Sequence, residues 1–564
     1  MTRGEPQQPQ EHFDVVVVGS GFGGSVMTYR LAEAGLKVCL LERGKAYPPG
    51  SFARSPWETA RNFWDPSEGM HGIWDVWSFR GLGGIVASGL GGGSLVYSNV
   101  VLRKDASTFV KESLANPGEE YWPVSFADLE PHYARHEKML GVSPYPFDRP
   151  PYDRTYKTRA MQYASARVGV EWLLPNLALS FAPPEDAPGE PVRDDPPNLH
   201  GRTRLTCRLC GECNIGCNYG SKNTLDFNYL SQAVLTHRAV IRTRSEVKTF
   251  APREGGGFTI DYADHSDAVE GEKRSQGPPL KRITANRLVL SAGSFGTTYL
   301  LLKNRAAFPE LSDRLGTQHC GNGDILMLAL EAKENGGPRI VDPGFGPVIT
   351  STVRVPDAAE GGPGRAYYIQ DGGHPQIVNW MVETSFQLAV VRRLIRFALG
   401  LVRLWLRWTR RSEIGREVAE AFGPARLSST SFPLFSMGRD IPDGRSKLTG
   451  DGYLDMDWSR KRSDVLFNQV RGTGRKMSDV LNAEFKDNLP WYLGRSLTVH
   501  PLGGCPMGDD PSQGVVDSHG RVFGYPGLYI ADGSVMPGPT GPNPSNTIAA
   551  LAHRFADQLI AEAR

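Results

Sequence analysis

The sequence predicts an α/β fold that opens with a dinucleotide-binding strand–helix–strand unit. Residues 15–18 form an uninterrupted valine run, which is typical of a parallel strand covered by helices on both faces. A G-x-G-x-x-G spacing follows at once, and 25–34 then reads as a helix. Residues 36–41 form a second apolar strand that ends at an acid, Glu42. This ordered set is far more specific than the glycine spacing alone.

Each residue type in this unit has a physical role. Gly19 allows the tight turn, Gly21 lets the backbone approach a pyrophosphate, and Gly24 lets the helix pack on the strand. The helix N-terminus then faces the diphosphate. Glu42 can accept hydrogen bonds from ribose hydroxyls and disfavours a 2′-phosphate, which argues against NADP. The alternative is an ordinary βαβ turn, and the motif does not separate FAD from NAD.

Three later segments distinguish FAD from NAD. They are 89–99 (GLGGGSLVYSN), 288–294 (LVLSAGS) and the C-terminal block with HPLGG at 500–504, YIADG at 529–533 and GPNP at 541–544. In this order, and with the N-terminal unit, they resemble the glucose–methanol–choline (GMC) family of FAD oxidoreductases. Within that family the chain is most similar to the cholesterol-oxidase-like bacterial branch. The resemblance runs nearly end to end and is weakest between about 321 and 485.

The resemblance implies a discontinuous FAD-binding Rossmann-like domain and an α+β substrate domain built on an antiparallel sheet. A chain of 564 residues agrees with two interleaved domains. Short apolar strands at 288–290 and 525–530 and a closing helix at 547–563 fit the FAD-binding domain. The expected FAD-binding parts are 10–120, 203–320 and 491–564, with a substrate-domain or lid segment at 121–202 and the main substrate domain at 321–490.

The family pattern also implies where FAD is bound. Some relatives attach FAD covalently through a histidine near the 91–94 loop, but this chain has no histidine between Gly81 and Asn99. We therefore expect non-covalent FAD. The expected contacts are Gly19, Gly21, Phe22, Gly23, Gly24, Glu42, Gly92, Gly93, Ser94, Asn99, Val247, Ala292, Gly293, Asp532, Gly533 and Asn543.

Two residues of the C-terminal block are the expected catalytic pair. In the family, the histidine of the HPLGG-type segment and a later asparagine flank the substrate hydroxyl, and here these are His500 and Asn543. A histidine suits removal of the hydroxyl proton because its pKa lies near working pH. Gly503 and Gly504 are expected to let the chain pass close to the flavin. The alternatives are a structural His500 that caps a loop, and Asn546 in place of Asn543.

The implied activity is FAD-dependent oxidation of an alcohol to a carbonyl, with hydride passing to the flavin and histidine as base. The expected substrate is a 3-hydroxysteroid, cholesterol-like or other lipidic alcohol, and O2 or an electron carrier is the acceptor. Ser428 stands near the position of the glutamate that isomerising cholesterol oxidases use, which argues against isomerisation and weakens the case for cholesterol itself. The alternatives are a dehydrogenase that passes electrons through an iron–sulfur cluster and a membrane-bound flavin scaffold without turnover.

A cysteine run gives the iron–sulfur alternative its basis. The spacing C-x2-C-x2-C-x3-C resembles a ferredoxin motif, although Asn218 stands where proline usually follows. Some GMC dehydrogenases carry such a centre near this region. Zinc and a packed loop of reduced thiols are the other interpretations. The candidate ligands are Cys207, Cys210, Cys213 and Cys217.

Segment 388–411 predicts a basic amphipathic helix. Its seven arginines fall within an arc of about 100°, and Leu, Phe and Trp occupy the rest. An interfacial membrane helix fits this pattern, and the alternative is a helix packed on the substrate domain. The net charge of +2 gives no case for nucleic acid. The N-terminal residues show no hydrophobic signal region and no twin-arginine, so we expect a cytoplasmic location. If the 388–411 helix binds a membrane, we expect the protein to be peripheral at the inner membrane face.

Overall fold

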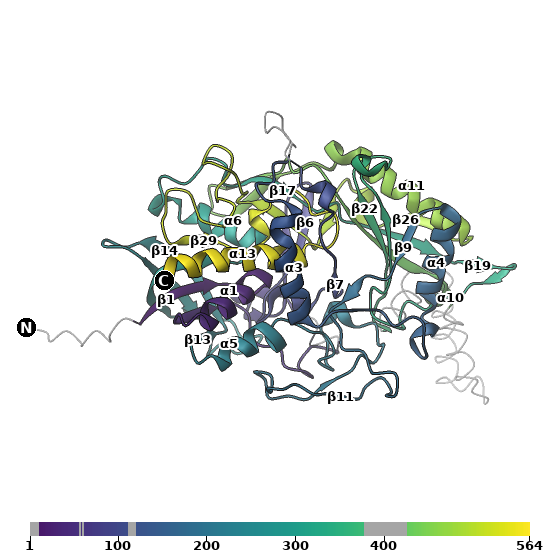
Figure 1. Cartoon of the computed structure of the whole chain (residues 1–564), viewed down its shortest axis with the longest axis horizontal. Helices are drawn as coiled ribbons and strands as arrows, with labels where there is room; N and C mark the ends of the chain where they lie inside the picture. The colour runs from purple at the N-terminus through teal and green to yellow at the C-terminus, as the bar shows by residue number, and fades with distance from the viewer. Residues whose placement is uncertain (1–10, 56–57, 59–60, 111–119, 377–425) are drawn as a thin grey trace, which may run out of the picture.

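The architecture is organised around two β-sheets (Figure 1). It was obtained as a computed structural model that describes residues 11–55, 58, 61–110, 120–376 and 426–564. The predicted helix at 388–411 lies outside these residues and stays a prediction.

The first sheet holds the dinucleotide-binding unit. Within the described residues it has seven strands, in the order β13-β2-β1-β16-β15-β14, and β29 also pairs with β16. The pairs that join β13, β2, β1, β16 and β29 are parallel, whereas β14 and β15 form an antiparallel extension. The bounds are β1 His12–Val18, β2 Val38–Leu41, β13 Ala239–Arg242, β14 Ser245–Pro252, β15 Phe258–Asp264, β16 Leu280–Leu290 and β29 Leu528–Ile530.

Helices from both ends of the chain pack together beside this sheet. Helix α1 (Phe22–Glu33) follows β1, and the C-terminal helix α13 (Ser545–Ala563) contacts both α1 and α3 (Phe126–Leu140). Figure 1 shows β1, α1 and α13 at one end of the molecule although the sequence separates them widely. Helix α1 starts three residues before the predicted 25–34, because the glycines of the turn already have helical geometry. The α/β class and the Rossmann-like unit are thereby confirmed.

The second sheet is antiparallel and lies at the other end of Figure 1. Among the described residues it has six strands, in the order β26-β18-β23-β22-β21-β9. Helices α4 (Tyr156–Val168) and α11 (Asp464–Val480) contact each other and pack on it. Its strands are β9 Glu171–Leu173, β18 Ile325–Leu330, β21 Thr352–Val355, β22 Tyr367–Asp371, β23 Phe432–Gly438 and β26 Glu484–Asp487.

Short elements connect the two sheets. Strand β27 (Ser496–Thr498) pairs with β6, and β28 (Leu502–Gly504) pairs with β17. The connection between β27 and β28 carries the predicted histidine. The remaining strands are β3 Trp64–Asp65, β4 Met70–His71, β5 Trp74–Ser78, β6 Leu82–Ala87, β7 Val100–Val101, β8 Ser143–Pro144, β10 Asn176–Leu177, β11 Pro191–Val192, β12 Arg204–Leu205, β17 Thr317–Cys320, β19 Lys333–Glu334, β20 Gly337–Pro338, β24 Arg445–Leu448 and β25 Leu454–Asp457. The remaining helices are α5 Ser231–Leu235, α6 Gly293–Lys303, α10 Arg426–Thr430 and α12 Leu489–Tyr492.

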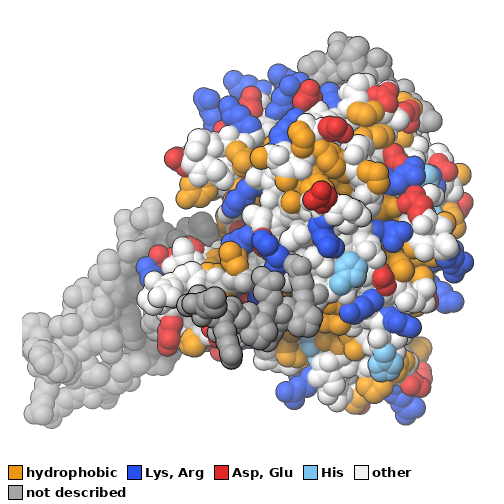
Figure 2. Space-filling model, turned by 90° about the vertical axis from the view of Figure 1, so that its left-hand side faces the viewer, with side chains coloured by type: hydrophobic (Ala, Val, Ile, Leu, Met, Phe, Trp, Pro, Cys, Tyr) orange, Lys and Arg blue, Asp and Glu red, His pale blue; other side chains and the backbone are white. Residues whose placement is uncertain are grey.

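Within the described residues, no helix is both long and apolar enough to cross a bilayer. On the face in Figure 2, basic and acidic side chains are interspersed, with hydrophobic side chains between them.

Several histidines are buried in these cores. Burial lowers the pKa of His136 and of His319 to about 3, and that of His132 to about 4. Burial also lowers the pKa of His553 well below its ordinary value. These side chains are therefore neutral in the folded protein at pH 5, whereas their unfolded counterparts are protonated.

We expect the free energy of unfolding to fall as pH drops from 7 to 5. Each depressed histidine can contribute a loss of about 2 kcal/mol in this window, because the unfolded state binds the extra proton. Asp440 opposes the trend, since burial raises its pKa to about 7 and the folded state gains that proton. Urea titrations at both pH values measure the sum. The loss should shrink in His136→Asn, and an unchanged loss there would contradict the assignment.

Candidate active site

Strand ends from three distant parts of the chain meet at one edge of the parallel sheet. Strands β1, β2, β16 and β29 are parallel and end at Val18, Leu41, Leu290 and Ile530. The segments that follow carry the glycine turn, Glu42, Ala292 and Asp532. Ligands of open α/β sheets bind at this carboxyl edge.

A cavity of about 710 Å³ opens at this edge and extends to the antiparallel sheet. Its lining includes both predicted catalytic residues, His500 and Asn543. It also includes most of the predicted cofactor residues, namely Gly19, Gly21, Phe22, Gly23, Glu42, Gly92, Gly93, Val247, Ala292, Gly293, Asp532 and Gly533.

The glycines show that this cavity suits a dinucleotide. A Cβ on Gly21, Gly93 or Gly293 would meet no protein atom within 4 Å, so these three backbones face open space. In contrast, a Cβ on Gly23 would lie 1.5 Å from the Ala531 carbonyl oxygen. The turn therefore packs tightly against the end of β29 on one side. On the cavity side, no side chain covers its backbone. Bare backbone at a helix N-terminus is the arrangement that binds a diphosphate.

Two buried carboxylates shape the cavity walls. Glu42 accepts hydrogen bonds from Ser20 N (3.0 Å) and Gly44 N (2.8 Å), which fixes the end of β2 against the glycine turn. Asp532 accepts from Gly293 N (2.9 Å), and burial raises the pKa of its carboxyl. Both residues line the cavity. Both residues remain candidates for binding FAD.

Three predicted cofactor residues lie behind the cavity wall. Gly24 packs on the turn that follows β1, because its Cβ would be 1.9 Å from the Gly19 carbonyl oxygen, which agrees with a role in close packing of the helix. The Ser94 hydroxyl donates to Gly91 O (2.7 Å) and accepts from Leu225 N (3.1 Å), so it braces its own loop. Asn99 is fully buried, and its neighbours Ser98 and Val100 line the cavity instead.

We expect the purified protein to be yellow and to release intact FAD on acid precipitation. A cavity with bare glycine backbone and no histidine between Gly81 and Asn99 offers no attachment point in this loop. The absorbance of the supernatant and of the pellet measures the outcome. Flavin that remains with the precipitated protein would contradict non-covalent binding.

His500 is held by a carboxylate that the sequence did not reveal. Its Nδ1 lies 2.8 Å from Asp324 Oδ1, and Asp324 stands immediately before β18. The other carboxylate oxygen, Oδ2, accepts from Thr498 Oγ1 (2.8 Å), Val499 N (2.8 Å) and His500 N (3.2 Å). An acidic partner keeps the proton on Nδ1, which leaves Nε2 as the basic nitrogen. Among the described residues, Nε2 has no hydrogen-bond partner, and His500 lines the cavity.

The loop that bears Asn543 is clamped from several sides. Asn322 accepts at Oδ1 from Thr540 N (2.9 Å) and Gly541 N (3.2 Å) and donates to Pro542 O (3.0 Å). Asn543 itself accepts from Gln370 Nε2 at 2.8 Å. Asn546 points elsewhere, since it donates to Glu137 at 3.1 Å and does not line the cavity. Of the two asparagines, the geometry favours Asn543.

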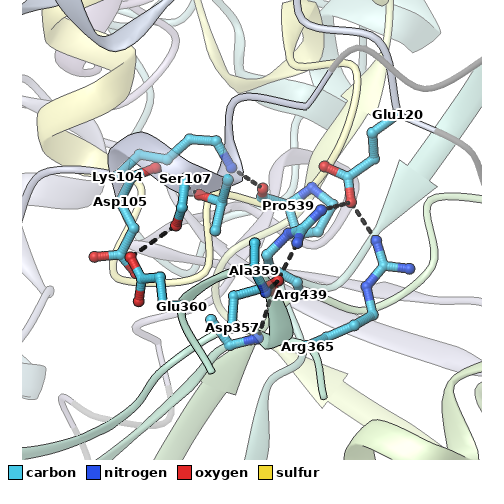
Figure 3. Close-up of polar contacts among 12 residues, drawn as sticks. Lys104, Asp105, Ser107, Glu120, Asp357, Ala359, Glu360, Arg365, Arg439 and Pro539 are labelled. Carbon is cyan, nitrogen blue, oxygen red and sulfur yellow. Dashed lines mark hydrogen bonds and ion pairs between the residues drawn. The ribbon is translucent and has the colours of Figure 1, made fainter. Parts of the chain in front are cut away.

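A buried ion cluster supports the same loop (Figure 3). Lys104 donates to Pro539 O at 3.0 Å. Glu120 accepts from both Arg365 and Arg439, and Arg439 also pairs with Asp357 at 2.7 Å. Lys104 and Glu120 are fully buried, and burial lowers the pKa of Lys104 to about 7. The cluster ties segments around 104, 120, 360 and 439 to the C-terminal block, so the loop is fixed by residues far away in sequence.

The glycines after His500 have a different role from the one expected. A Cβ on Gly503 would lie 1.9 Å from the Gln318 carbonyl oxygen, and one on Gly504 would lie 2.1 Å from Thr298 Oγ1. Both residues have positive φ, and neither lines the cavity. They allow β28 to press against β17 and α6, and only His500, Pro501 and Leu502 of this segment reach the cavity.

The cysteine loop is not arranged as a metal site. All four cysteines of the run are free, and the described residues contain no group of three or more His, Cys, Asp or Glu that could hold a metal ion. Burial raises the pKa of Cys210 to about 12 and that of Cys207 well above its ordinary value, which disfavours the thiolate that binds metals. The prediction of an iron–sulfur cluster or zinc is therefore not supported.

The loop instead braces the cavity. Lys222 Nζ donates to the carbonyl oxygens of Leu95 (3.0 Å), Tyr97 (2.7 Å) and Cys213 (3.0 Å). Asn214, the residue after Cys213, lines the cavity and accepts from Ser98 Oγ at 2.8 Å. Sequence reasoning missed Asp324 and Gln370 because they lie in segments without a recognisable motif. It missed Asn214 because this residue lies within the cysteine run but is not one of its cysteines.

Comparison with known proteins identifies the family of this chain. Residues 454–552 match the family model described as GMC oxidoreductase, and 17–52 match that of an NAD(P)-binding Rossmann-like domain. The chain is 30% identical to a cholesterol oxidase of Mycobacterium tuberculosis, over 96% of this chain and 90% of that protein. It is 28% identical to a cholesterol oxidase of Acinetobacter baumannii, over 98% and 95%. It is also 23% identical to a 2-methyl-1,2-propanediol dehydrogenase of Mycolicibacterium austroafricanum, over 97% and 95%.

Solved structures show the same fold. A formate oxidase superimposes with a TM-score of 0.60 at 16% identity and covers 99% of each chain. Pyridoxine 4-oxidase from Mesorbium loti superimposes with a TM-score of 0.56 at 16% identity, over 97% of this chain and 99% of that one. The matched models, the full-length relatives and the cavity agree, and the chain belongs to the GMC oxidoreductases, FAD-dependent enzymes that act on CH–OH donors.

Proposed function

We propose that this enzyme oxidises a lipidic alcohol, of the 3-hydroxysteroid or cholesterol-like class, to the corresponding carbonyl with His500 as the base. The observation that carries the proposal is the pairing of His500 with Asp324 at 2.8 Å on the wall of the cavity. FAD, when bound, takes up the hydride from the carbinol carbon. His500 Nε2 accepts the hydroxyl proton, and Asp324 stabilises the imidazolium that results.

The walls of the cavity support an apolar substrate. Beyond the catalytic pair, the lining comes from β18, β23, β25 and neighbouring loops and includes Ile325, Leu326, Ile349, Phe435, Met437 and Leu454. Ser428 is not among the lining residues. The acids that do line the cavity, such as Asp324, are engaged in hydrogen bonds. The proposed product of a Δ5 sterol therefore keeps its double bond in place.

Exposed apolar side chains line part of the cavity and continue along α12. Tyr453 (72% exposed) and Val499 (58%) line the cavity yet face solvent. Asn488 also lines it, and α12 follows with Leu489 (72%), Tyr492 and Leu493 exposed. We call Tyr453, Leu489, Tyr492, Leu493, Leu497 and Val499 the apolar rim. Side chains of this kind around a cavity mouth support contact with a membrane that holds the substrate.

We expect Leu489→Ser/Tyr492→Ser/Leu493→Ser to weaken co-sedimentation with phosphatidylcholine vesicles and to slow oxidation of a vesicle-held alcohol more than that of a detergent-dispersed one. The reason is the loss of apolar insertion. Leu280→Ser is the matched control, since Leu280 is 68% exposed at the far end of β16. If the triple variant binds vesicles as the wild type does, the apolar rim does not dock, and segment 388–411 becomes the segment to test.

Anaerobic mixing tests the proposed function directly. Cholesterol, a long-chain primary alcohol and a sugar are each added to the holoenzyme while the absorbance of oxidised flavin is followed. Bleaching by cholesterol or the long-chain alcohol supports the proposal, and bleaching by the sugar alone overturns it. Loss of the product's Δ5 double bond would contradict the absence of isomerisation.

The identity of the electron acceptor needs a separate measurement. The relatives include both oxidases and a dehydrogenase, and the cysteine loop gives no route through a cluster. We propose O2 as the acceptor. Peroxide formed in proportion to product supports it, whereas turnover only with an artificial acceptor would favour an electron carrier. Membership of an enzyme family and a partnered His500 argue against a scaffold without turnover.

A further inference from the structure

The side-chain amide of Asn543 can adopt two orientations, related by a half-turn, that have nearly the same shape. Its oxygen and nitrogen differ little in size but have opposite hydrogen-bonding roles. A substrate hydroxyl that gives its proton to His500 Nε2 needs a donor, not a second acceptor, at its oxygen. The orientation of Asn543 therefore decides whether the cavity suits an alcohol and the alkoxide that develops from it.

In the structure, Gln370 is the hydrogen-bond partner of the Asn543 amide. Its Nε2 donates to Asn543 Oδ1 at 2.8 Å, so the asparagine oxygen is occupied on the side of the sheet. Among the described residues, Asn543 Nδ2 has no hydrogen-bond partner, and Asn543 lines the cavity. The cavity thus presents an acceptor, His500 Nε2, and a donor, Asn543 Nδ2, which match the two hydrogen-bonding roles of a single hydroxyl group. Gln370 lines the cavity as well, and its Oε1 has no hydrogen-bond partner among the described residues.

The position of Gln370 is suited to this task. It lies in β22, a central strand of the antiparallel sheet between β21 and β23, and it is fully buried. Its backbone is paired through Thr352 on one side and Phe435 on the other. The backbone of Gln370 therefore has little freedom to move, whereas Asn543 lies on a loop. A donor carried by a rigid strand can orient an amide carried by a loop.

We propose that Gln370 is a positioning residue that orients the Asn543 amide, so that Nδ2 is the donor to the substrate oxygen. This inference rests on the proposed alcohol oxidation. Gln370 itself acts only through Asn543.

Two substitutions distinguish an orienting role of Gln370 from a purely structural one. Gln370→Met removes the donor with little change in size, and we expect flavin reduction by cholesterol to slow roughly tenfold, as for one lost hydrogen bond. Gln370→Glu replaces the amide with a group that donates only when it is protonated. When the glutamate is ionised, it accepts a hydrogen bond from Asn543 Nδ2 and so turns the asparagine amide. The rate of flavin reduction should therefore fall as pH rises through the pKa of this glutamate. A pH profile of Gln370→Glu parallel to that of the wild type would overturn the proposal.

The control and the double variant complete the test. Thr352→Val changes the buried cross-strand partner of Gln370 without touching Asn543, and it should leave the rate near the wild-type value. In an Asn543→Ala background, Gln370→Met should slow flavin reduction no further. An equal slowing in both backgrounds, or a Thr352→Val rate as low as that of Gln370→Met, would show general damage to the sheet.

A stability measurement keeps this inference distinct from the proposed function. Thermal unfolding of the four holoenzymes (wild type, Gln370→Met, Asn543→Ala and the double variant) measures the coupling without any substrate. We expect the two shifts in Tm to be non-additive, because one hydrogen bond is lost in each single variant. Additive shifts refute the orientation of Asn543 by Gln370. Non-additive shifts in an enzyme that no alcohol reduces would refute the proposed substrate class and leave the orientation standing.

Discussion

His500→Ala should lower turnover by ~10²–10⁴-fold while FAD stays bound, because the general base is lost from the cavity wall. His500 lines the cavity and pairs with Asp324 at the start of β18, and it is not part of the glycine turn that is predicted to bind the dinucleotide. Stopped-flow flavin reduction and the flavin-to-protein absorbance ratio measure the two effects separately.

His500→Gln is the matched control for size. Glutamine can keep a hydrogen bond to Asp324 but cannot carry the proton, so its loss should approach that of alanine. Turnover near the wild-type value in either variant would remove His500 from the mechanism. An apoprotein that fails to bind FAD would instead indicate a structural role for this side chain.

Asp324→Asn should cost roughly 10²-fold or more in the flavin reduction rate, because it changes which nitrogen of His500 is protonated. In the wild type, Oδ2 accepts from three donors, and Oδ1 accepts from His500 Nδ1. The single oxygen of asparagine is drawn to the three donors, which leaves its NH2 group facing Nδ1. His500 then carries its proton on Nε2, where a base is required.

Asp440→Asn is the control for this change. Asp440 is also fully buried and accepts from Gly321 N at 2.9 Å, close to the same turn, but it does not hydrogen-bond His500. Burial raises the pKa of Asp440 to about 7, so a neutral asparagine is a mild replacement. If both aspartate variants lose the same activity, the turn and not the tautomer is responsible.

Much of the FAD-binding half was predictable because its signals are local. The valine run, the glycine spacing and the strand that ends at Glu42 are contiguous, and they predict β1, α1 and β2 to within a few residues. The two roles that failed or changed depend on distant neighbours. Gly503 and Gly504 are pressed against β17 and α6. The Cys213 carbonyl is joined to the 89–99 loop through Lys222, and the described residues show no metal-binding group at the four cysteines.

The sequence by itself determined the Rossmann-like unit, through periodicity and motif spacing among residues near each other in the chain. The predicted FAD contacts and the two catalytic candidates came from the family resemblance that the ordered motifs carry. The tertiary structure alone decided that Asp324 partners His500 and that Gln370 partners Asn543, across separations of 176 and 173 residues. Such pairs leave no local pattern in the sequence. The two residues of each pair come together only after interleaved segments have folded into two sheets, which places the element that carries one residue against the loop that carries the other.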